Sequence, residues 1–263
     1  APKVGEAWPL AIAKTESKIL KEGTGEKVDK NATLKVNYVG VNGRTGKEFD
    51  SSYKRGTTAD FPLAQVVPGF AKGLVGKHQG DRVLIMMPGS DGYDSQGGAP
   101  QAGIMKGDSL IFVVDIVAIP LPKATGETVK PVAGLPTVKE VQGAPAVTIG
   151  KATKPNKLVV QPLIKGKGAA VTAHDSIDVK YRTYAWSSGE LIEDGYSGEP
   201  VTGSMNSVIP GWKKGLIGQT VGSRVMLIVP PADAYPNGST NPPVKKGETL
   251  IYVIDILSAQ KES

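Results

Sequence analysis

The sequence predicts an α+β protein of two tandem domains, each built mostly of antiparallel strands with one short helix. The first observation is an internal repeat, since Val66–Pro88 and Val208–Pro230 align without a gap and are identical at 11 of 23 positions. The second is composition, because 33 glycines and 20 prolines favour turns and short strands over helical bundles. Each copy of the repeat takes up about half of the chain. It is too long for a solenoid, whose units span roughly 20–50 residues, and therefore indicates a duplicated domain.

The repeat continues on both sides of this segment. Tyr38 matches Tyr181, and the stretch that starts at Asp108 matches the one that starts at Glu248, with almost the same spacing between the copies. Prolines concentrate between the two copies, which is typical of a semi-stiff linker. We therefore expect a first domain over residues 1–121 with an N-terminal tail over about 1–15, a Pro-rich linker over 122–133, and a second domain over 134–263.

Apolar residues alternate or run together in the segments that we expect to be strands. Leu34–Val41 alternates with a period of two, which is typical of a strand with one buried face, and Ile177–Trp186 repeats this pattern. Arg82–Met87 and Leu110–Ile119 are apolar, β-branched runs bounded by turn residues, and they indicate central strands. Beyond the linker, the sequences LPTV and PAVTI predict further extended segments.

One helix is expected in each copy. Pro68 stands where proline is favoured, at the first helical position, and Gly76 follows the last apolar position as a C-terminal stop. Phe70 and Leu74 are four apart in the sequence and share one face of the helix. A helix of about two turns is unstable alone, so these side chains must be buried against a sheet. Trp212 takes the place of Phe70 in the second copy.

Composition excludes several classes of function. Without cysteine the chain has no disulfide, thiolate nucleophile or zinc–thiolate site, and no apolar run reaches the ~18 residues of a membrane-spanning helix. The net charge of +6 comes from dispersed lysines without interleaved aromatic residues, so we expect a solvated basic surface and no nucleic-acid binding. Because the sequence starts at Ala1 without methionine, we expect a processed, extracytoplasmic protein, with a cytoplasmic location left open.

A series of motifs in the first copy resembles one protein family. In chain order they are Tyr38, the sequence FDSS at Phe49–Ser52, Arg55, the sequence VVPGF at Val66–Phe70, and Tyr93. This order resembles that of the FKBP-type peptidyl-prolyl cis-trans isomerases, and the resemblance extends to the second copy. It implies that each domain is an antiparallel half-barrel sheet wrapped around its short helix. It also implies that the chain is an enzyme that isomerises X–Pro bonds in folding protein clients.

The chemistry that this family performs suits such residues. Rotation about an X–Pro bond is opposed by amide resonance, with a barrier of ~18–20 kcal/mol, and takes tens to hundreds of seconds without catalysis. A pocket that removes water from the amide disfavours its charge-separated planar form, and hydrogen bonds placed for the twisted form add to this effect. No nucleophile, metal or cofactor is required. The resemblance implies proline-containing peptides and proteins as substrates, and macrolides such as tacrolimus or rapamycin as candidate ligands.

The resemblance also implies roles for residues of the first copy. The catalytic candidates, which would hold or polarise the substrate carbonyls, are Tyr38, Asp50 and Tyr93. The substrate-binding candidates, with Phe70 as the floor of the pocket, are Phe49, Arg55, Val66, Val67, Phe70, Ile104 and Phe112. Taken singly, without the resemblance, the aromatic residues would be core residues and Asp50–Ser52 a turn. Only the joint order of the motifs favours a site.

Two features of the first copy depart from the family pattern. Phe70 stands where the family usually has tryptophan, and Ala59 stands where it often has an aromatic residue in the loop after Arg55. A phenyl ring offers less area to a prolyl ring than an indole does. We therefore expect a wider or shallower pocket with reduced or altered activity.

The second copy keeps less of the pattern. Its equivalents of the site residues are Tyr181, Ile192, Glu193, Val208, Ile209, Trp212, Tyr235 and Tyr252. Glu193 replaces the aspartate, and no arginine stands where Arg55 does. Because one extra methylene is enough to misplace a carboxylate in a packed site, we expect catalysis mainly in the first domain and a partly degenerate second site. The alternative function is a non-catalytic chaperone or protein-binding module that uses the same apolar pockets.

Overall fold

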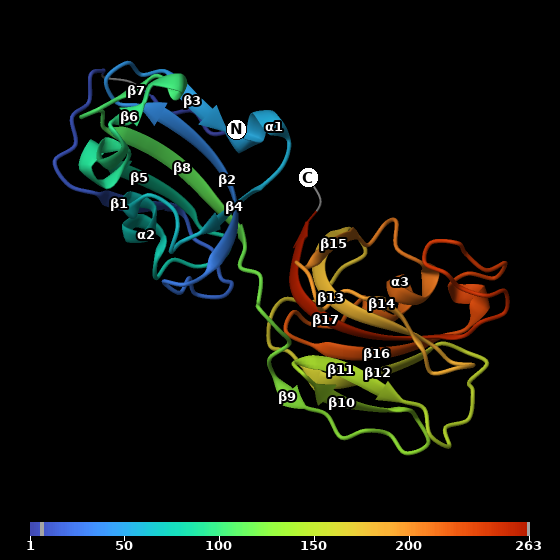
Figure 1. Cartoon of the computed structure of the whole chain (residues 1–263). Helices are drawn as coiled ribbons and strands as arrows, with labels where there is room; N and C mark the ends of the chain where they lie inside the picture. The colour runs from blue at the N-terminus through green and yellow to red at the C-terminus, as the bar shows by residue number, and fades with distance from the viewer. Residues whose placement is uncertain (6–7, 262–263) are drawn as a thin grey trace. The chain divides into compact units, whose positions relative to one another are not determined.

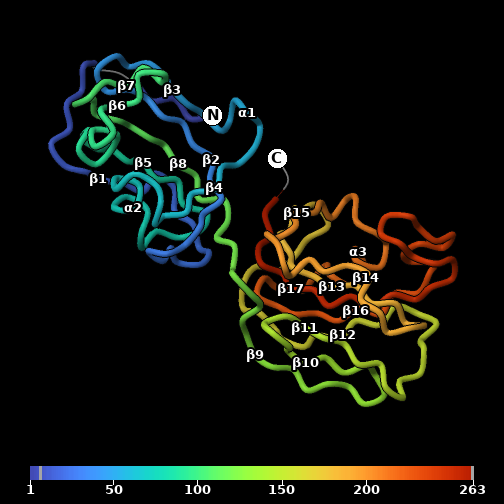
Figure 2. Tube along the Cα trace, viewed as in Figure 1, coloured from blue at the N-terminus to red at the C-terminus, as the bar shows by residue number. Residues whose placement is uncertain are grey.

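In the computed structural model the chain forms two compact units, and the boundary falls between Pro120 and Leu121. The structure describes residues 1–5 and 8–261. Each unit contains a curved antiparallel sheet and a buried helix of about two turns, and unit 1 has an additional one-turn helix that the sequence does not predict, as Figure 1 shows; Figure 2 gives the Cα trace of both units. The predicted α+β fold of two half-barrel domains is therefore confirmed.

Unit 1 contains one six-stranded sheet in the order β1-β5-β8-β2-β3, with β4 also paired to β2. Its strands are β1 (Glu16–Lys21), β2 (Thr33–Asn42), β3 (Glu48–Ser51), β4 (Ala59–Pro62), β5 (Arg82–Met87), β6 (Gly98–Ala99), β7 (Ile104–Met105) and β8 (Leu110–Ala118). Its helices are α1 (Ser52–Arg55), α2 (Pro68–Leu74) and the 3-10 turns η1 (Gly89–Asp91), η2 (Asp94–Gln96) and η3 (Pro100–Ala102).

Unit 2 contains a seven-stranded sheet in the order β14-β13-β17-β16-β12-β9, with β15 paired to β13. Its strands are β9 (Glu127–Thr128), β10 (Thr137–Val141), β11 (Ala144–Thr148), β12 (Val159–Lys165), β13 (Asp175–Ala185), β14 (Leu191–Asp194), β15 (Val201–Ser204), β16 (Arg224–Val229) and β17 (Leu250–Lys261). Its helices are α3 (Pro210–Leu216) and the 3-10 turn η4 (Pro231–Asp233). The strands from β12 onward repeat the pairings of unit 1, as the internal repeat predicts.

The short helix α2 is held by the sheet, as its sequence predicts. Pro68 is its first residue, and both Phe70 and Leu74 are buried in the core of unit 1. The helix approaches β5 so closely that a Cβ atom at Gly69 would lie 2.4 Å from the Met87 sulfur. Gly76, just beyond the helix, has a φ of +82°, which a glycine adopts without strain. The predicted start, buried face and stop of this helix are confirmed.

The segment 122–133, expected to be a linker, is instead bonded to the sheet of unit 2. The Thr125 N–H donates to Gly222 O at 2.8 Å, and the Val129 N–H donates to Leu163 O at 2.9 Å. Between them, β9 pairs with β12. The prolines that suggested a linker are compatible with this arrangement. They lie on either side of the paired residues, whose own N–H groups remain available as donors.

A second addition to unit 2 is the hairpin β10–β11, which the extended sequences LPTV and PAVTI predict as strands. Its turn residues Gln142 and Gly143 both have positive φ, which suits a tight two-residue connection. The hairpin packs on a separate apolar cluster of the sheet that contains Ile228, Ile251 and Val253. It therefore covers the face of the sheet opposite the helix. Within the described residues, no helix is long and apolar enough to cross a membrane.

Candidate functional site

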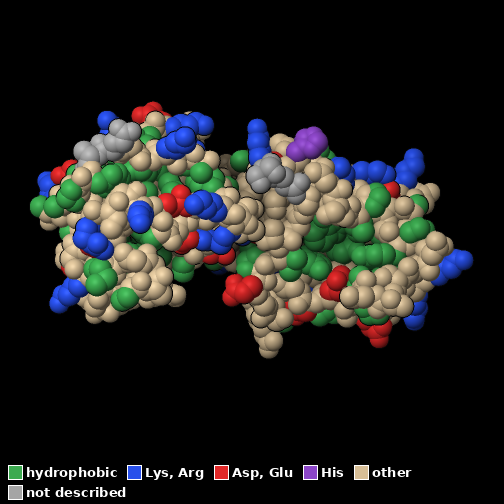
Figure 3. Space-filling model, turned by 90° about the horizontal axis from the view of Figure 1, so that it is seen from above, with side chains coloured by type: hydrophobic (Ala, Val, Ile, Leu, Met, Phe, Trp, Pro, Cys, Tyr) green, Lys and Arg blue, Asp and Glu red, His purple; other side chains and the backbone are tan. Residues whose placement is uncertain are grey.

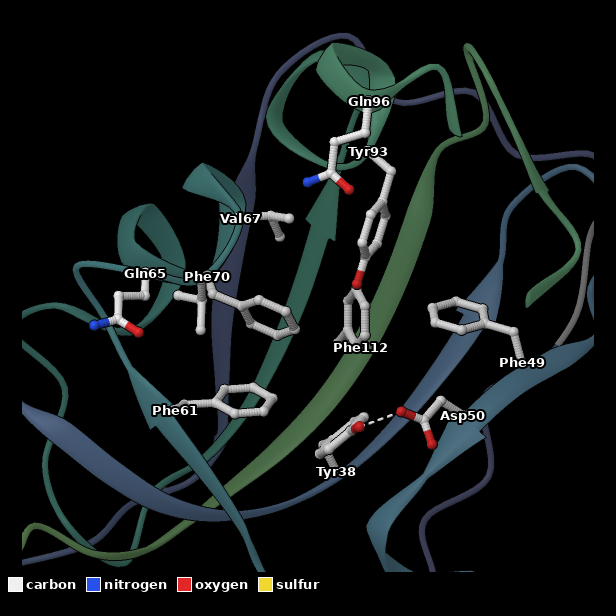
Figure 4. A pocket seen from close by; sticks show the side chains of 11 residues that line it. Tyr38, Phe49, Asp50, Phe61, Gln65, Val67, Phe70, Tyr93, Gln96 and Phe112 are labelled. Atoms are coloured by element: carbon white, nitrogen blue, oxygen red, sulfur yellow. Dashed lines mark hydrogen bonds between the residues drawn. The ribbon is translucent and has the colours of Figure 1, made fainter. Parts of the chain in front are cut away.

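Unit 1 contains a cavity of about 270 Å³ between helix α2 and the concave face of the sheet. It is lined by Tyr38, Phe49, Asp50, Phe61, Gln65, Val66, Val67, Phe70, Tyr93, Gln96 and Phe112. Figure 4 shows these side chains converging from β2, β3, β4, α2, β8 and the loop that carries η2. Phenyl rings lie at the centre of this group, and the polar side chains are spread around it, with Asp50 and Tyr38 on one side and Gln65, Gln96 and Tyr93 elsewhere.

The aromatic rings are packed against one another at the bottom of the cavity. Phe70, at the start of α2, has its ring centroid 4.5 Å from that of Phe112 and 4.8 Å from that of Phe61. Phe49 stands edge-on to Phe112 at 5.5 Å. Phe70 and Phe112 are almost fully buried, whereas Phe49 and Phe61 are half-buried and reach the opening. The result is a water-poor apolar surface of fixed shape.

Beside the cavity lies a polar cluster of Tyr38, Asp50 and Arg55. The Tyr38 hydroxyl and the Arg55 guanidinium both donate to the Asp50 carboxylate, and Arg55 Nη2 also donates to the Tyr38 hydroxyl oxygen at 3.1 Å. Strand β2 and helix α1 are tied together beside this cluster, because the Tyr38 N–H donates to Ser52 Oγ at 2.8 Å. The sequence FDSS therefore supplies both the carboxylate and the residue that anchors it.

Electrostatics keep this cluster charged at neutral pH. Burial opposes ionisation of Asp50, but the hydrogen bonds from Tyr38 and Arg55 outweigh it and hold the pKa of the carboxyl below its usual value. Burial, together with the hydrogen bond to Asp50, raises the pKa of Tyr38. Burial also raises the pKa of Tyr93, with a further contribution from the Asp50 charge. Asp50 is thus an anion, and both tyrosines keep their hydroxyl protons.

Two donors at the cavity are available to a ligand. Figure 4 shows the Tyr93 hydroxyl pointing into the cavity, and within the described part of the chain it has no hydrogen-bond acceptor. The Val67 N–H, just before α2, likewise has no backbone acceptor among residues 1–5 and 8–261. Donors of this kind can hold peptide carbonyl groups.

Most of the residues predicted from the sequence are brought together here. The catalytic candidates Tyr38, Asp50 and Tyr93 all line the cavity. Two of the predicted binding residues do not line it: Arg55 acts through Asp50 and Tyr38, and Ile104 is buried in the core beneath. The remaining predicted binding residues, Phe49, Val66, Val67, Phe70 and Phe112, form its walls and floor.

One sequence-based expectation about the cavity is wrong. Ala59 predicts a pocket without an aromatic wall after Arg55, but Phe61 in β4 supplies that wall two positions later. Its ring lies 5.2 Å from Tyr38 and 4.8 Å from Phe70. The sequence could have indicated Phe61, because side chains two positions apart in a strand, such as Ala59 and Phe61, point to the same face of the sheet. Gln65 and Gln96 also line the cavity and were not predicted.

The equivalent place in unit 2 has the same layout with different groups. Trp212 is buried at the start of α3, and the rings of Tyr181 and Tyr252 stand edge-on to it at 5.1 and 5.4 Å. The Tyr181 hydroxyl donates to Glu193 Oε1 at 3.2 Å. The extra methylene of Glu193 therefore does not break the tyrosine–carboxylate contact. Gly203 stands at the repeat position of Phe61, since β15 pairs with β13 there as β4 pairs with β2.

Similarity to known proteins agrees with this geometry. A family model for the FKBP-type peptidyl-prolyl cis-trans isomerases matches residues 24–117 and 167–257. The chain is 32% identical over 117 residues to a Corynebacterium glutamicum protein named "Probable FK506-binding protein", covering 44% of this chain and 98% of that one. It is 40% identical over 100 residues to an FK506-binding protein of Streptomyces anulatus, covering 37% of this chain and 80% of that one.

A third relative extends well beyond the region that matches this chain. The chain is 34% identical over 139 residues to the FKBP-type peptidyl-prolyl cis-trans isomerase FkpA of Aeromonas hydrophila, and it spans about half of that protein, with 49% of this chain and 50% of FkpA covered. The family model covers most of both units, and the matched residues include the aromatic cavity and its carboxylate cluster. The chain belongs to the FKBP-type peptidyl-prolyl cis-trans isomerase family.

Proposed function

We propose that this protein accelerates X–Pro isomerisation in folding protein clients, with catalysis mainly in unit 1. The observation that carries the proposal is the aromatic cavity of unit 1 with its charge-compensated Asp50. Unit 2 retains a carboxylate and a tyrosine at the equivalent place, but Gly198 and Gly203 stand where Arg55 and Phe61 do. Unit 2 therefore binds client segments with weaker catalysis or none.

The cavity floor would act on the amide by excluding water. A prolyl ring seated on Phe70, between Phe61 and Phe112, places its preceding amide against apolar surface. The planar amide is more charge-separated than the twisted one, so loss of hydration raises the energy of the ground state more than that of the transition state. Because the pocket is already formed, little reorganisation is needed when the substrate binds.

The polar groups would fix the substrate and favour the twisted amide. The Tyr93 hydroxyl and the Val67 N–H donate to carbonyl groups of the bound chain and hold it while the X–Pro bond rotates. The ionised Asp50, oriented by Tyr38 and Arg55, presents a fixed dipole to the rotating carbonyl. Each of these groups acts without changing its protonation state.

A tandem arrangement suits extended clients. A segment bound by unit 2 keeps the rest of the client at a raised effective concentration near unit 1, provided that the client chain spans both sites. Proline-containing unfolded chains are therefore the proposed clients. Macrolide ligands of the kind named for the FK506-binding relatives are proposed for the cavity of unit 1, where Phe61 supplies a third phenyl wall. Action outside the cytoplasm stays a prediction.

The proposal is tested by isomerisation of a short X–Pro peptide by the intact chain and two variants. We expect Asp50→Ala to lower kcat/KM on the order of a hundredfold, as for other preorganised electrostatic groups, and Trp212→Ala to leave it near the wild-type value. Circular dichroism confirms that both variants fold. Wild-type turnover no faster than the uncatalysed rate would instead favour the non-catalytic binding module.

A further inference from the structure

The residues around Arg55 in unit 1 form a binding site for its cationic side chain. Its guanidinium carbon lies 5.6 Å from the centroid of the Tyr38 ring, within the range of a cation–π contact. The same guanidinium pairs with the Asp50 carboxylate and donates to the Tyr38 hydroxyl oxygen at 3.1 Å. One ring, one carboxylate and one hydroxyl thus hold one cation, which the chain itself supplies.

Unit 2 keeps the ring, the carboxylate and the hydroxyl, but not the cation. Tyr181 and Glu193 repeat Tyr38 and Asp50, and Gly198 stands at the repeat position of Arg55. Within residues 1–5 and 8–261, no ion pair joins Glu193 to a lysine, arginine or histidine. The adjacent Asp194, by contrast, is paired with Arg182 at 2.7 Å.

The unpaired carboxylate is held in place by its neighbours. Glu193 accepts hydrogen bonds from the Tyr181 hydroxyl at 3.2 Å and from Thr183 Oγ1 at 2.7 Å. Thr183 is fully buried, so this support is rigid. The negative charge is felt by the surrounding hydroxyls, because burial and the charge of Glu193 together raise the pKa of Tyr181 to about 12 and also raise that of Tyr235.

The rim of the second site is also less charged than that of the first. Lys54 and Glu48 of unit 1, which pair with each other at 2.8 Å, are replaced at the repeat positions by Ser197 and Leu191. Leu191 is 43% exposed. Figure 3 shows hydrophobic side chains gathered in the middle of the visible face of unit 2, whereas basic and acidic side chains lie among them on unit 1. Neither Leu191 nor Ser197 brings a counter-charge to Glu193.

We propose that the second site binds a cationic side chain, lysine or arginine, of an extended client segment. The client cation would take the place that Arg55 holds in unit 1, over the Tyr181 ring and beside Glu193. An aromatic face and a carboxylate together favour a cation over an apolar side chain of the same length, because both contacts strengthen when water is excluded. This preference rests on the proposed role of unit 2 as a client-binding domain and names the chemistry that the domain recognises.

The test uses the full chain and a signal confined to the second site. Of the three tryptophans in the sequence, only Trp212 lies there, so its indole N–H resonance reports binding in unit 2 alone. Two capped pentapeptides are titrated that differ only in a central lysine or norleucine. We expect the lysine peptide to bind roughly tenfold more tightly than the norleucine peptide. This is the usual contribution of a partly desolvated cation–π contact to affinity.

Two variants remove the preference in different ways. Glu193→Gln keeps the size of the side chain and removes its charge, and Gly198→Arg supplies an internal guanidinium where unit 1 has one. Gly198 tolerates a side chain, because a Cβ atom there would have no neighbour within 4 Å. Both variants should reduce the lysine-to-norleucine ratio to about one. The matched controls Gly198→Ala and Glu199→Gln, the latter at an exposed acid close by, should keep it.

The possible outcomes separate this preference from the proposed function. Equal or tighter binding of the norleucine peptide would overturn it, as would a lysine preference that survives both Glu193→Gln and Gly198→Arg. A Trp212 signal that responds to a proline peptide and not to the lysine peptide would also overturn it and would identify a second prolyl site instead. Loss of isomerase activity in Asp50→Ala does not bear on the lysine preference, which is measured without turnover.

Discussion

One of the differences between the two sites, at Gly40, decides which side chains fit beside it. Gly40 in β2 has no side chain, and a Cβ atom there would lie 2.7 Å from ring atoms of both Phe49 and Phe112. The repeat position in unit 2 is Thr183, whose hydroxyl supports Glu193. The aromatic wall of unit 1 therefore requires the glycine, and the longer carboxylate of unit 2 is accommodated by the threonine. The two sets of residues are alternatives.

This dependence predicts the effect of Gly40→Thr. The new side chain displaces Phe49 from the cavity wall, and overpacking beside the buried Phe112 lowers the free energy of unfolding by about 1–3 kcal/mol. Isomerase activity of the intact chain should fall with it. The double variant Gly40→Thr with Phe49→Ile should regain the stability but not the activity, as measured by urea unfolding and a peptide assay. Unchanged activity in the single variant would show that Phe49 is not a required wall.

Asp108 is a positioning residue for the loop that carries Ile104. Its carboxylate accepts from Arg44 Nε at 2.7 Å, from Asn42 Nδ2 at 2.7 Å and from the Met105 N–H at 2.8 Å. The hydrogen bond from Arg44, assisted by that from Asn42, outweighs burial and lowers the pKa of Asp108 to about 2. The side chain of Asp108 is 5% exposed, so the interaction is largely shielded from solvent.

The depressed pKa predicts how stability depends on pH. Asp108 contributes stability that is complete above its unfolded pKa, near ~4, and that is lost as the pH falls through about 2. Asp108→Asn should lower the free energy of unfolding at pH ~7 by about 2 kcal/mol. The difference between wild type and variant should shrink as the pH falls from ~5 to ~2. Urea unfolding across this range measures it, and a difference that is constant with pH would contradict the assignment.

At the scale of elements, those specified by residues close in sequence are easier to predict than pairings between distant strands. The helix α2 is predictable because Pro68, the spacing of Phe70 and Leu74, and Gly76 are all local. The pairing of β9 with β12 is not, since the two-residue strand Glu127–Thr128 is too short to have a pattern of its own. The role of Phe61 was overlooked although its strand position indicates it, because Phe61 lies two positions beyond Ala59 and points to the same face of β4.

The docked segment 121–133 is expected to stabilise unit 2. The Leu121 N–H donates to Leu257 O at 2.9 Å, and the Ala124 N–H donates to Asp255, a buried carboxylate paired with Arg224. Removing the segment loses several hydrogen bonds and leaves some of their partners exposed or unpaired. A chain of residues 134–263 should be less stable than one of 121–263 by roughly 2–4 kcal/mol. Equal urea midpoints for the two chains would show that the segment is only a linker.

At the scale of the whole molecule, the duplication preserves the fold but not all the groups of the site. Each unit keeps its own core around Phe70 or Trp212, and each keeps a tyrosine hydroxyl bound to a carboxylate. Only unit 1, among the described residues, adds an internal cation and three phenyl walls to this pair. The duplication and the family are predictable from sequence because repeated motifs carry them. The compensating exchange of Gly40 for Thr183 is not, since it depends on contacts between strands.

The proposed location of catalysis in unit 1 is tested most directly with the two units in isolation. Residues 1–120 and 121–263 are produced separately, at the boundary between the two units, and each is assayed for isomerisation of the same short X–Pro peptide. We expect 1–120 to retain the kcat/KM of the intact chain and 121–263 to show little or none. Equal turnover by 121–263 would contradict the proposed division between a catalytic and a client-binding unit.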